Sequence, residues 1–298
     1  MNVLEVSNLS RSFGGHAVLQ NLSFSVPEHT IFGFIGKNGA GKTTTMKLIT
    51  GLLKADQGEI FVNGKKVRAG ENETNSYIGY LPDVPEFYEF LTPEEYLTLC
   101  ARITGMQESE SRGRIGELLE LVGLSDVKRK IRGFSRGMKQ RLGIAQALLN
   151  RPRLLICDEP TSALDPIGRK EILDILCAVK KETTVLFSTH ILSDVERICD
   201  EIAYLKDGHV VLQGNLEEIK AEQGKAYVEI RFEDSSDRRS FQTVCPKAVS
   251  EEERRLIFAP ETEMLELLQV LARYEIPIQK IEKVEPTLEE IFLEVEKK

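Results

Sequence analysis

Residues 31–50 read IFGFIGKNGAGKTTTMKLIT, an apolar run followed by a glycine-rich turn and a helix-forming segment. Glycines let the backbone turn its N–H groups inward without side-chain collisions. A helix that starts directly after such a turn adds unpaired N–H groups and the positive end of its dipole. The spacing G-x-x-x-x-G-K-T between a strand and a helix therefore predicts a loop that binds the phosphates of a nucleotide.

The loop residues have distinct expected roles. Lys42 is expected to reach the β- and γ-phosphates, and the Thr43 hydroxyl is the expected magnesium ligand. The residues predicted to contact the nucleotide are Gly36, Lys37, Asn38, Gly39, Ala40, Gly41, Lys42, Thr43 and Thr44.

An acidic pair ends the buried-type strand RLLICD at 153–158. In open α/β sheets, ligands bind at the carboxyl ends of the strands. Asp158 is expected to hold the metal, mainly through its water shell, and Glu159 to polarise the attacking water. Such a pair is common at strand ends, but beside a phosphate loop it predicts nucleotide hydrolysis.

Strands and helices alternate through the first 220 residues. The segment TPEE begins a helix with Thr92 as N-cap, Pro93 in the first turn and Glu95 completing a capping box. The near-continuous apolar strands predict a parallel sheet with helices on both faces. The expected strands are 3–10, 17–26, 31–36, 59–67 with an Asn-Gly turn at 62–65, 76–81, 153–158, 183–190, 201–208 and 209–214. Helices are expected within 92–150, after 166 and at 191–200.

Composition shifts at 221–226, and the pattern after it differs. Strands are expected at 226–232, 254–260 and near 276–284, with an amphipathic helix at 261–275 and a final helix capped by Thr287 and Glu290. We expect a separate α+β module over 222–298, without a catalytic constellation of its own.

Composition excludes some functions. The formal net charge is −8, which argues against a broad basic face for nucleic acid. The five cysteines are scattered without a C-x-x-C pair, as in proteins with reduced thiols. The sequence shows neither a signal-peptide pattern nor an apolar run long enough to span a membrane.

Further motifs make the chain resemble an ATP-binding cassette (ABC) ATPase over residues 1–220. FSRGMKQRL (134–142) resembles the family signature, SALD (162–165) the D-loop, and FSTH the segment that ends in the switch histidine, His190. Phe13 in RSFGG matches the aromatic residue that stacks on adenine. Taken alone, Ser135 also fits a helix N-cap, His190 a strand-end histidine, and Phe13 hairpin packing.

The resemblance implies ATP and Mg2+ as ligands and a specific fold. The expected architecture is a RecA-like α/β core with an antiparallel β subdomain and an inserted helical subdomain at about 84–150. Glu159, His190 and Lys42 are the implied catalytic residues. The signature residues Ser135, Arg136 and Gly137, with Asp165 of the D-loop, are implied to act on a second copy of the chain.

Two departures from the family pattern stand out. Arg136 and Phe134 replace the usual glycine and leucine of the signature, and Asp83 replaces the usual glutamine of the Q-loop. Asp83 is hypothesised to contact the metal and to sense transport, although its charge would repel the γ-phosphate.

The resemblance also implies partners. One set of motifs in a chain implies a dimer, most simply a homodimer, that sandwiches two ATP molecules and drives a separate polytopic membrane permease. Segment 83–96, with Phe87, Tyr88 and Phe90, is either the docking site or an ordinary connector. The cassette is most similar to ATPases of bacterial drug and antibiotic exporters, including the bacitracin-resistance type.

That group implies a cytoplasmic location at the inner face of the membrane. It also implies a C-terminal module that stabilises the dimer or regulates it. The alternative is a soluble ABC ATPase that acts on ribosomes or nucleic acid, which the single cassette and acidic balance disfavour. A regulatory module without turnover is disfavoured by Glu159 and His190.

Overall fold

The computed structural model describes residues 1–223, 226–259 and 261–297. The chain divides into two compact units, Met1–Leu216 and Glu217–Lys298. The expected boundary near residue 221 lies inside α7 (Leu216–Gln223), most of which belongs to the second unit.

The first unit is built on a sheet of six strands in the order β10-β9-β3-β8-β7-β6. Neighbours from β9 to β6 run parallel, and only β10 pairs antiparallel with β9. Every residue of β3, β7 and β8 is buried, which explains why apolar residues predominate in these strands. The bounds are β3 Ile31–Gly36, β6 Ile78–Leu81, β7 Leu154–Asp158, β8 Thr184–Thr189, β9 Glu201–Lys206 and β10 His209–Asn215.

Several helices pack on this sheet or on each other beside it. Helix α1 (Lys42–Ile49) contacts β3 and β7, α6 (Leu192–Ile198) contacts β3, and α5 (Pro166–Val179) contacts α6. This layered arrangement confirms the predicted α/β core.

A second, antiparallel sheet has the order β2-β1-β4-β5. The Asn-Gly turn joins β4 and β5, and both Asn63 and Gly64 adopt positive φ, as a two-residue hairpin turn requires. The Phe24 and Phe34 rings, 5.0 Å apart between centroids, link the two sheets within one core. The bounds are β1 Asn2–Phe13, β2 His16–Pro27, β4 Gln57–Val62 and β5 Lys65–Lys66.

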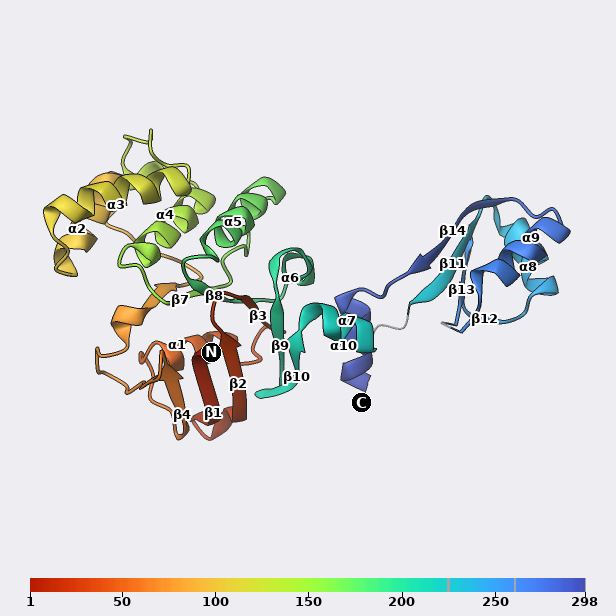
Figure 1. Ribbon diagram of the computed structural model, residues 1–298, viewed down its shortest axis with the longest axis horizontal. Helices are drawn as coiled ribbons and strands as arrows, with labels where there is room; N and C mark the ends of the chain where they lie inside the picture. Colours follow the sequence, from red (N-terminus) through yellow and green to blue (C-terminus); the bar gives the residue numbers. More distant parts are fainter. Residues whose placement is uncertain (224–225, 260, 298) are drawn as a thin grey trace. The chain divides into compact units, whose positions relative to one another are not determined.

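Helices α2 (Pro93–Ile103), α3 (Glu108–Leu121) and α4 (Arg136–Leu148) form the inserted helical group (Figure 1). The predicted capping box at Thr92 and Glu95 is confirmed, because each side chain bonds the other residue's backbone N–H. Helix α4 lies directly on β6. A Cβ at Gly79 would come within 2.2 Å of the Ala147 carbonyl oxygen.

The second unit contains a four-stranded antiparallel sheet in the order β12-β13-β11-β14. Phe241 of α8 and Leu267 of α9 pack with Phe232 and Phe258 of the strands in a core of their own. The bounds are β11 Tyr227–Phe232, α8 Ser235–Val244, β12 Ala248–Glu252, β13 Arg255–Phe258, α9 Met264–Arg273, β14 Ile278–Val284 and α10 Leu288–Lys297.

Among the described residues, none of the helices combines the length and the apolar character needed to cross a bilayer.

Candidate functional site

The phosphate loop connects β3 to α1 with a backbone that only glycine adopts easily. Gly39 and Gly41 have φ of +85° and +109°. A Cβ at Gly41 would also lie 2.6 Å from Leu19 Cδ2. These constraints explain why glycines occupy the turn, and they place the start of α1 directly after it.

Lys42, the first residue of α1, is buried and folds back over the loop. Its ammonium Nζ donates to the Gly36 carbonyl oxygen at 2.6 Å and to the Lys37 carbonyl oxygen at 3.2 Å. It also forms an ion pair with Glu159 Oε1 at 3.1 Å. The loop lysine and the predicted catalytic carboxylate therefore share one site.

Asp158 ends β7 and Glu159 follows it, as expected, and Ser188 of β8 positions both. The Ser188 hydroxyl donates to Asp158 Oδ1 at 2.6 Å, while the Glu159 N–H lies 3.1 Å from the same hydroxyl oxygen. Glu159 has a positive φ of 49°, an unusual backbone conformation for a non-glycine residue. Such strain is held by the surrounding structure and is concentrated at functional sites.

His190 follows the last residue of β8 and reaches the same carboxylate. Its Nδ1 lies 2.9 Å from Glu159 Oε2, so Lys42 and His190 contact different oxygens of one side chain. The Glu159 side chain is only 12% exposed. The carboxyl ends of three adjacent strands, β3, β8 and β7, thus lead to Lys42, His190 and Glu159.

The site contains side-chain oxygen atoms of the kind that bind a magnesium ion. Magnesium is usually held by one or two side-chain oxygens together with substrate phosphates and waters. Thr43, an exposed residue in the first turn of α1, offers a hydroxyl, and Asp158 offers a carboxylate at the end of β7, against which α1 packs. Asp158 also acts on Tyr80, whose pKa rises to about 12 through burial and then through that negative charge.

The signature and the D-loop lie together on the surface. Ser135 is the N-cap of α4, where its hydroxyl oxygen accepts from the Met138 N–H at 3.2 Å. A Cβ at Gly137 would lie 3.8 Å from Leu164 Cδ2, so the two motifs touch within one chain. Asp165 caps α5 by accepting from the Gly168 N–H at 2.8 Å.

The side chains of Phe13 and Asp83 contact residues other than Lys42, Glu159 and His190. Phe13 ends β1, is 43% exposed and lies under the Arg11 guanidinium, 4.6 Å from the ring centroid. The Asp83 carboxylate pairs with the Arg136 guanidinium at 3.1 Å. The adenine contact of Phe13 and the metal contact of Asp83 stay predictions.

Sequence reasoning missed the buried network that supports the loop after Glu159. The Thr161 hydroxyl donates to Asp194 Oδ2 at 2.7 Å, and Arg169 pairs with Asp194 Oδ1 at 2.5 Å. It also missed Ser188. The one sequence signal was the position of Ser188, two residues before His190 in the predicted strand 183–190.

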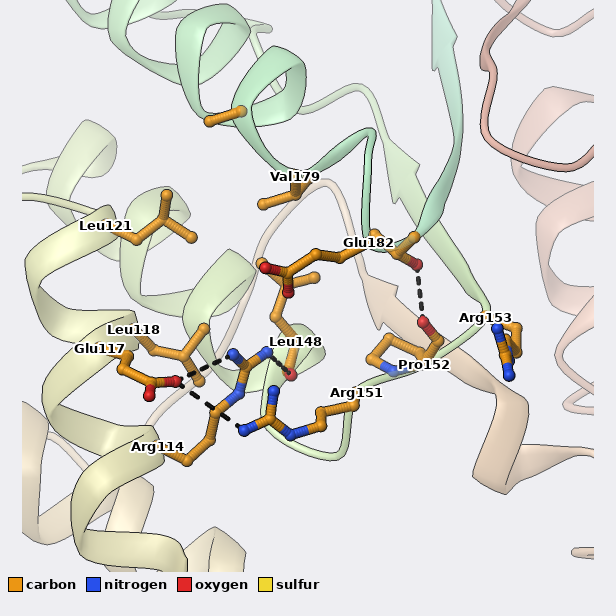
Figure 2. Close-up of a pocket in the computed structure, with 12 residues that line it drawn as sticks. Arg114, Glu117, Leu118, Leu121, Leu148, Arg151, Pro152, Arg153, Val179 and Glu182 are labelled. Atoms are coloured by element: carbon orange, nitrogen blue, oxygen red, sulfur yellow. Dashed lines mark hydrogen bonds and ion pairs between the residues drawn. The ribbon is translucent and has the colours of Figure 1, made fainter.

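A cavity of about 620 Å3 lies among α3, α5 and the segment before β7 (Figure 2). Figure 2 shows Glu117 between Arg114 and Arg151, and Arg114 also donates to the Leu148 carbonyl oxygen at 2.9 Å. None of the sequence-predicted site residues lines this cavity. We therefore assign nucleotide binding to the phosphate loop, not to this cavity.

The fold and the site define a phosphate-loop nucleotide hydrolase of the cassette type. The family model described as ABC transporter matches residues 19–162, and that of the ATP-binding protein DrrA1-3-like C-terminal domain matches residues 214–295. The uncharacterized ABC transporter ATP-binding protein YxlF of Bacillus subtilis is 45% identical over 222 residues, which cover 74% of each chain.

Two further similarities are informative. The bacitracin transport ATP-binding protein BcrA of Bacillus licheniformis is 38% identical over 78% of this chain and 76% of its own length. An ATP-binding cassette solved as a dimer in a post-hydrolysis state, bound to ADP and Pi, superposes with a TM-score of 0.64 at 27% identity. It covers 72% of this chain and 98% of its own. The chain belongs to the family of ABC transporter ATP-binding proteins, and it is an ATPase.

Proposed function

We propose that this ATP-binding subunit drives a separate membrane permease and that the transport direction is export. The convergence of Lys42, Glu159 and His190 on one site supports the hydrolytic part of this proposal. The similarity to a bacitracin transport ATP-binding protein supports export.

Hydrolysis uses groups that are already oriented. The N–H groups of residues 36–44 and the Lys42 ammonium bind the phosphates, and Phe13 stacks on the adenine. Thr43 and Asp158 would hold magnesium, which would supply positive charge to neutralise the phosphates. Glu159 orients the attacking water and accepts its proton, while His190 holds the Glu159 carboxylate through Nδ1. The low exposure of Glu159 strengthens each of these electrostatic contacts.

The complete ATP site requires two copies of the cassette, and in the simplest case the two chains are identical. Ser135 and Asp165 are exposed, and they lie at the adjacent starts of α4 and α5. Figure 1 shows α4 grouped with α2 and α3, apart from α1, which follows the phosphate loop. We infer that Ser135, Arg136, Gly137 and Asp165 complete the ATP site of the second copy.

The permease docks on the segment that follows β6. Val84, Tyr88 and Phe90 are 64%, 56% and 64% exposed, whereas Phe87 packs edge-on against Tyr96. This docking holds the subunit at the cytoplasmic face of the membrane. We infer that the second unit stabilises or regulates the dimer. Its described residues include charged pairs, and none of the predicted catalytic residues lies among them.

The test is a pulldown from detergent-solubilised membranes of the source organism with a tagged Glu159→Gln chain and ATP. A stoichiometric polytopic protein is the expected result, and its loss in a Lys42→Ala chain is the matched control. Ribosomal proteins in its place, or a closed dimer alone, would favour the soluble ABC ATPase.

A further inference from the structure

Two of the three residues at which this chain departs from the family pattern, Asp83 and Arg136, bind each other. The Arg136 guanidinium Nη2 lies 3.1 Å from Asp83 Oδ1, although 53 residues separate the two in sequence. Asp83 follows β6, and Arg136 is the first residue of α4, directly after Ser135. The charge added to the signature is therefore neutralised within the same chain.

The same face of α4 makes further contacts with the segment after β6. Lys139 Nζ lies 2.7 Å from Glu89 Oε1, and the buried Gln140 amide donates to the Asp83 carbonyl oxygen at 2.7 Å. Positions 136, 139 and 140 lie on one side of a helix. A Cβ at Gly143 would come within 2.4 Å of Leu81 Cδ1.

Backbone bonds join the far end of this segment to the residues before α4. The Ile131 N–H donates to the Leu91 carbonyl oxygen at 2.9 Å, and the Arg132 N–H to the Glu89 carbonyl oxygen at 3.0 Å. Segment 83–91 is thus bonded at both ends to residues 131–140. These backbone and buried contacts hold the segment in place without the Asp83–Arg136 pair, which is half-exposed.

We propose that Asp83 is a positioning residue: it neutralises Arg136 and holds it away from the nucleotide that Ser135 contacts in the second copy. This inference rests on the proposed dimer. It also gives Asp83 a different role from the metal ligand expected from its Q-loop position.

The test is a charge cycle at the two positions in the Glu159→Gln background. Asp83→Asn leaves Arg136 uncompensated beside Ser135, so half-maximal dimer formation should need about two- to fivefold less ATP. Arg136→Gln leaves the negative charge of Asp83 without its partner, so half-maximal dimer formation should need correspondingly more ATP. In the double variant, the ATP concentration for half-maximal dimer formation should return close to that of the parent. The differences in this concentration between the single variants and the parent should shrink at high salt.

Turnover adds a second readout in chains that retain Glu159. Asp83→Asn should lower KM and kcat together, because a more stable closed dimer opens more slowly. The matched control is the Arg197–Asp174 pair, which has a similar distance of 3.0 Å and similar exposure but joins α6 to α5. Asp174→Asn and Arg197→Gln should leave dimer formation unchanged.

Other outcomes would overturn the proposal. If Asp83→Asn raises the magnesium concentration required for dimer formation, and adding Arg136→Gln does not cancel this rise, Asp83 is a metal ligand. If dimer formation in Asp83→Asn and Arg136→Gln matches the parent, the pair has no positioning role. If the parent Glu159→Gln chain stays monomeric with ATP, both the proposed function and this inference are overturned. If the parent dimerises, the effects of the variants test this inference alone.

Discussion

The Lys42 ammonium and the Glu159 carboxylate lie 3.1 Å apart, so the residue predicted to bind phosphate pairs with the residue predicted to polarise water. A phosphate that approaches Lys42 competes with Glu159 for the same positive charge. His190 remains bonded to the other Glu159 oxygen at 2.9 Å and can retain its orientation. We therefore expect phosphate binding and the release of the predicted catalytic carboxylate to be linked through the Lys42 side chain.

This relationship predicts the behaviour of Glu159→Gln. The neutral amide no longer holds the Lys42 ammonium as an ion pair and no longer repels the γ-phosphate. We expect ATP to bind more tightly than in the wild type, while turnover falls by about 10² to 10⁴ through loss of the general base. Fluorescent-nucleotide titration and phosphate release measure the two effects. Weaker ATP binding, or turnover at the wild-type rate, would contradict the assignment.

Local sequence signals predicted much of the fold because their causes are local. The capping box at Thr92 and the turn at Asn63 each depend on residues within four positions. Helix α8 was missed because, among its residues, only Phe241 is buried, so it shows no apolar stripe. Its one signal was Asp234, which caps the helix by accepting from the Ser236 and Asp237 N–H groups.

Contacts between distant residues could not be predicted in the same way. Motif spacing indicated that Lys42, Glu159 and His190 act together, but not that Ser188 positions Asp158 or that Arg136 pairs with Asp83. Such pairs depend on strand order and helix packing, which bring together residues 30 and 53 positions apart. Neither periodicity nor composition contains that information.

The close packing of α4 on β6 predicts a steric effect at Gly79. In Gly79→Ala the new methyl group would meet the Ala147 carbonyl oxygen at 2.2 Å, and a backbone atom cannot move aside cheaply. We expect a loss of about 1–3 kcal/mol in the free energy of unfolding, measured by urea denaturation.

The matched control is Gly116→Ala in α3, where a Cβ would meet nothing within 4 Å. Because alanine favours a helix over glycine, this change should stabilise by about 0.5–1 kcal/mol. Equal effects at the two sites would refute the packing argument.

The buried Asp194 predicts a large effect that local sequence does not reveal. Asp194→Ala removes the acceptor of Thr161 and the partner of Arg169, leaving polar groups uncompensated. Breaking a buried pair in this way costs about 3–5 kcal/mol. Urea denaturation should show this loss. Asp174→Ala, which breaks an exposed pair with Arg197, should cost about 1 kcal/mol or less. If the two variants lose similar amounts of unfolding free energy, the buried Asp194 network contributes no more to stability than the exposed pair.

The cysteines predict an order of thiol reactivity. Cys177 is exposed, whereas Cys157 is fully buried in β7. Burial, and then the negative charge of Asp158, raise the pKa of the Cys157 thiol well above its ordinary value of 9.0. Partial burial also raises the pKa of the Cys177 thiol, so the order of labelling depends on access: at pH 8 a disulfide reagent should label native Cys177 in the rapid phase and Cys157 only after unfolding.

The raised pKa of Cys157 also sets the sign of a pH effect on stability. Its thiol stays protonated in the folded chain while the unfolded thiol ionises above about pH 8.5, so this contribution to stability is complete below that pH and declines above it. Cys157→Ala should reduce the decline, and Cys177→Ser should abolish the rapid labelling phase. Rapid labelling that survives Cys177→Ser and disappears in Cys157→Ala would reverse the burial of the two residues.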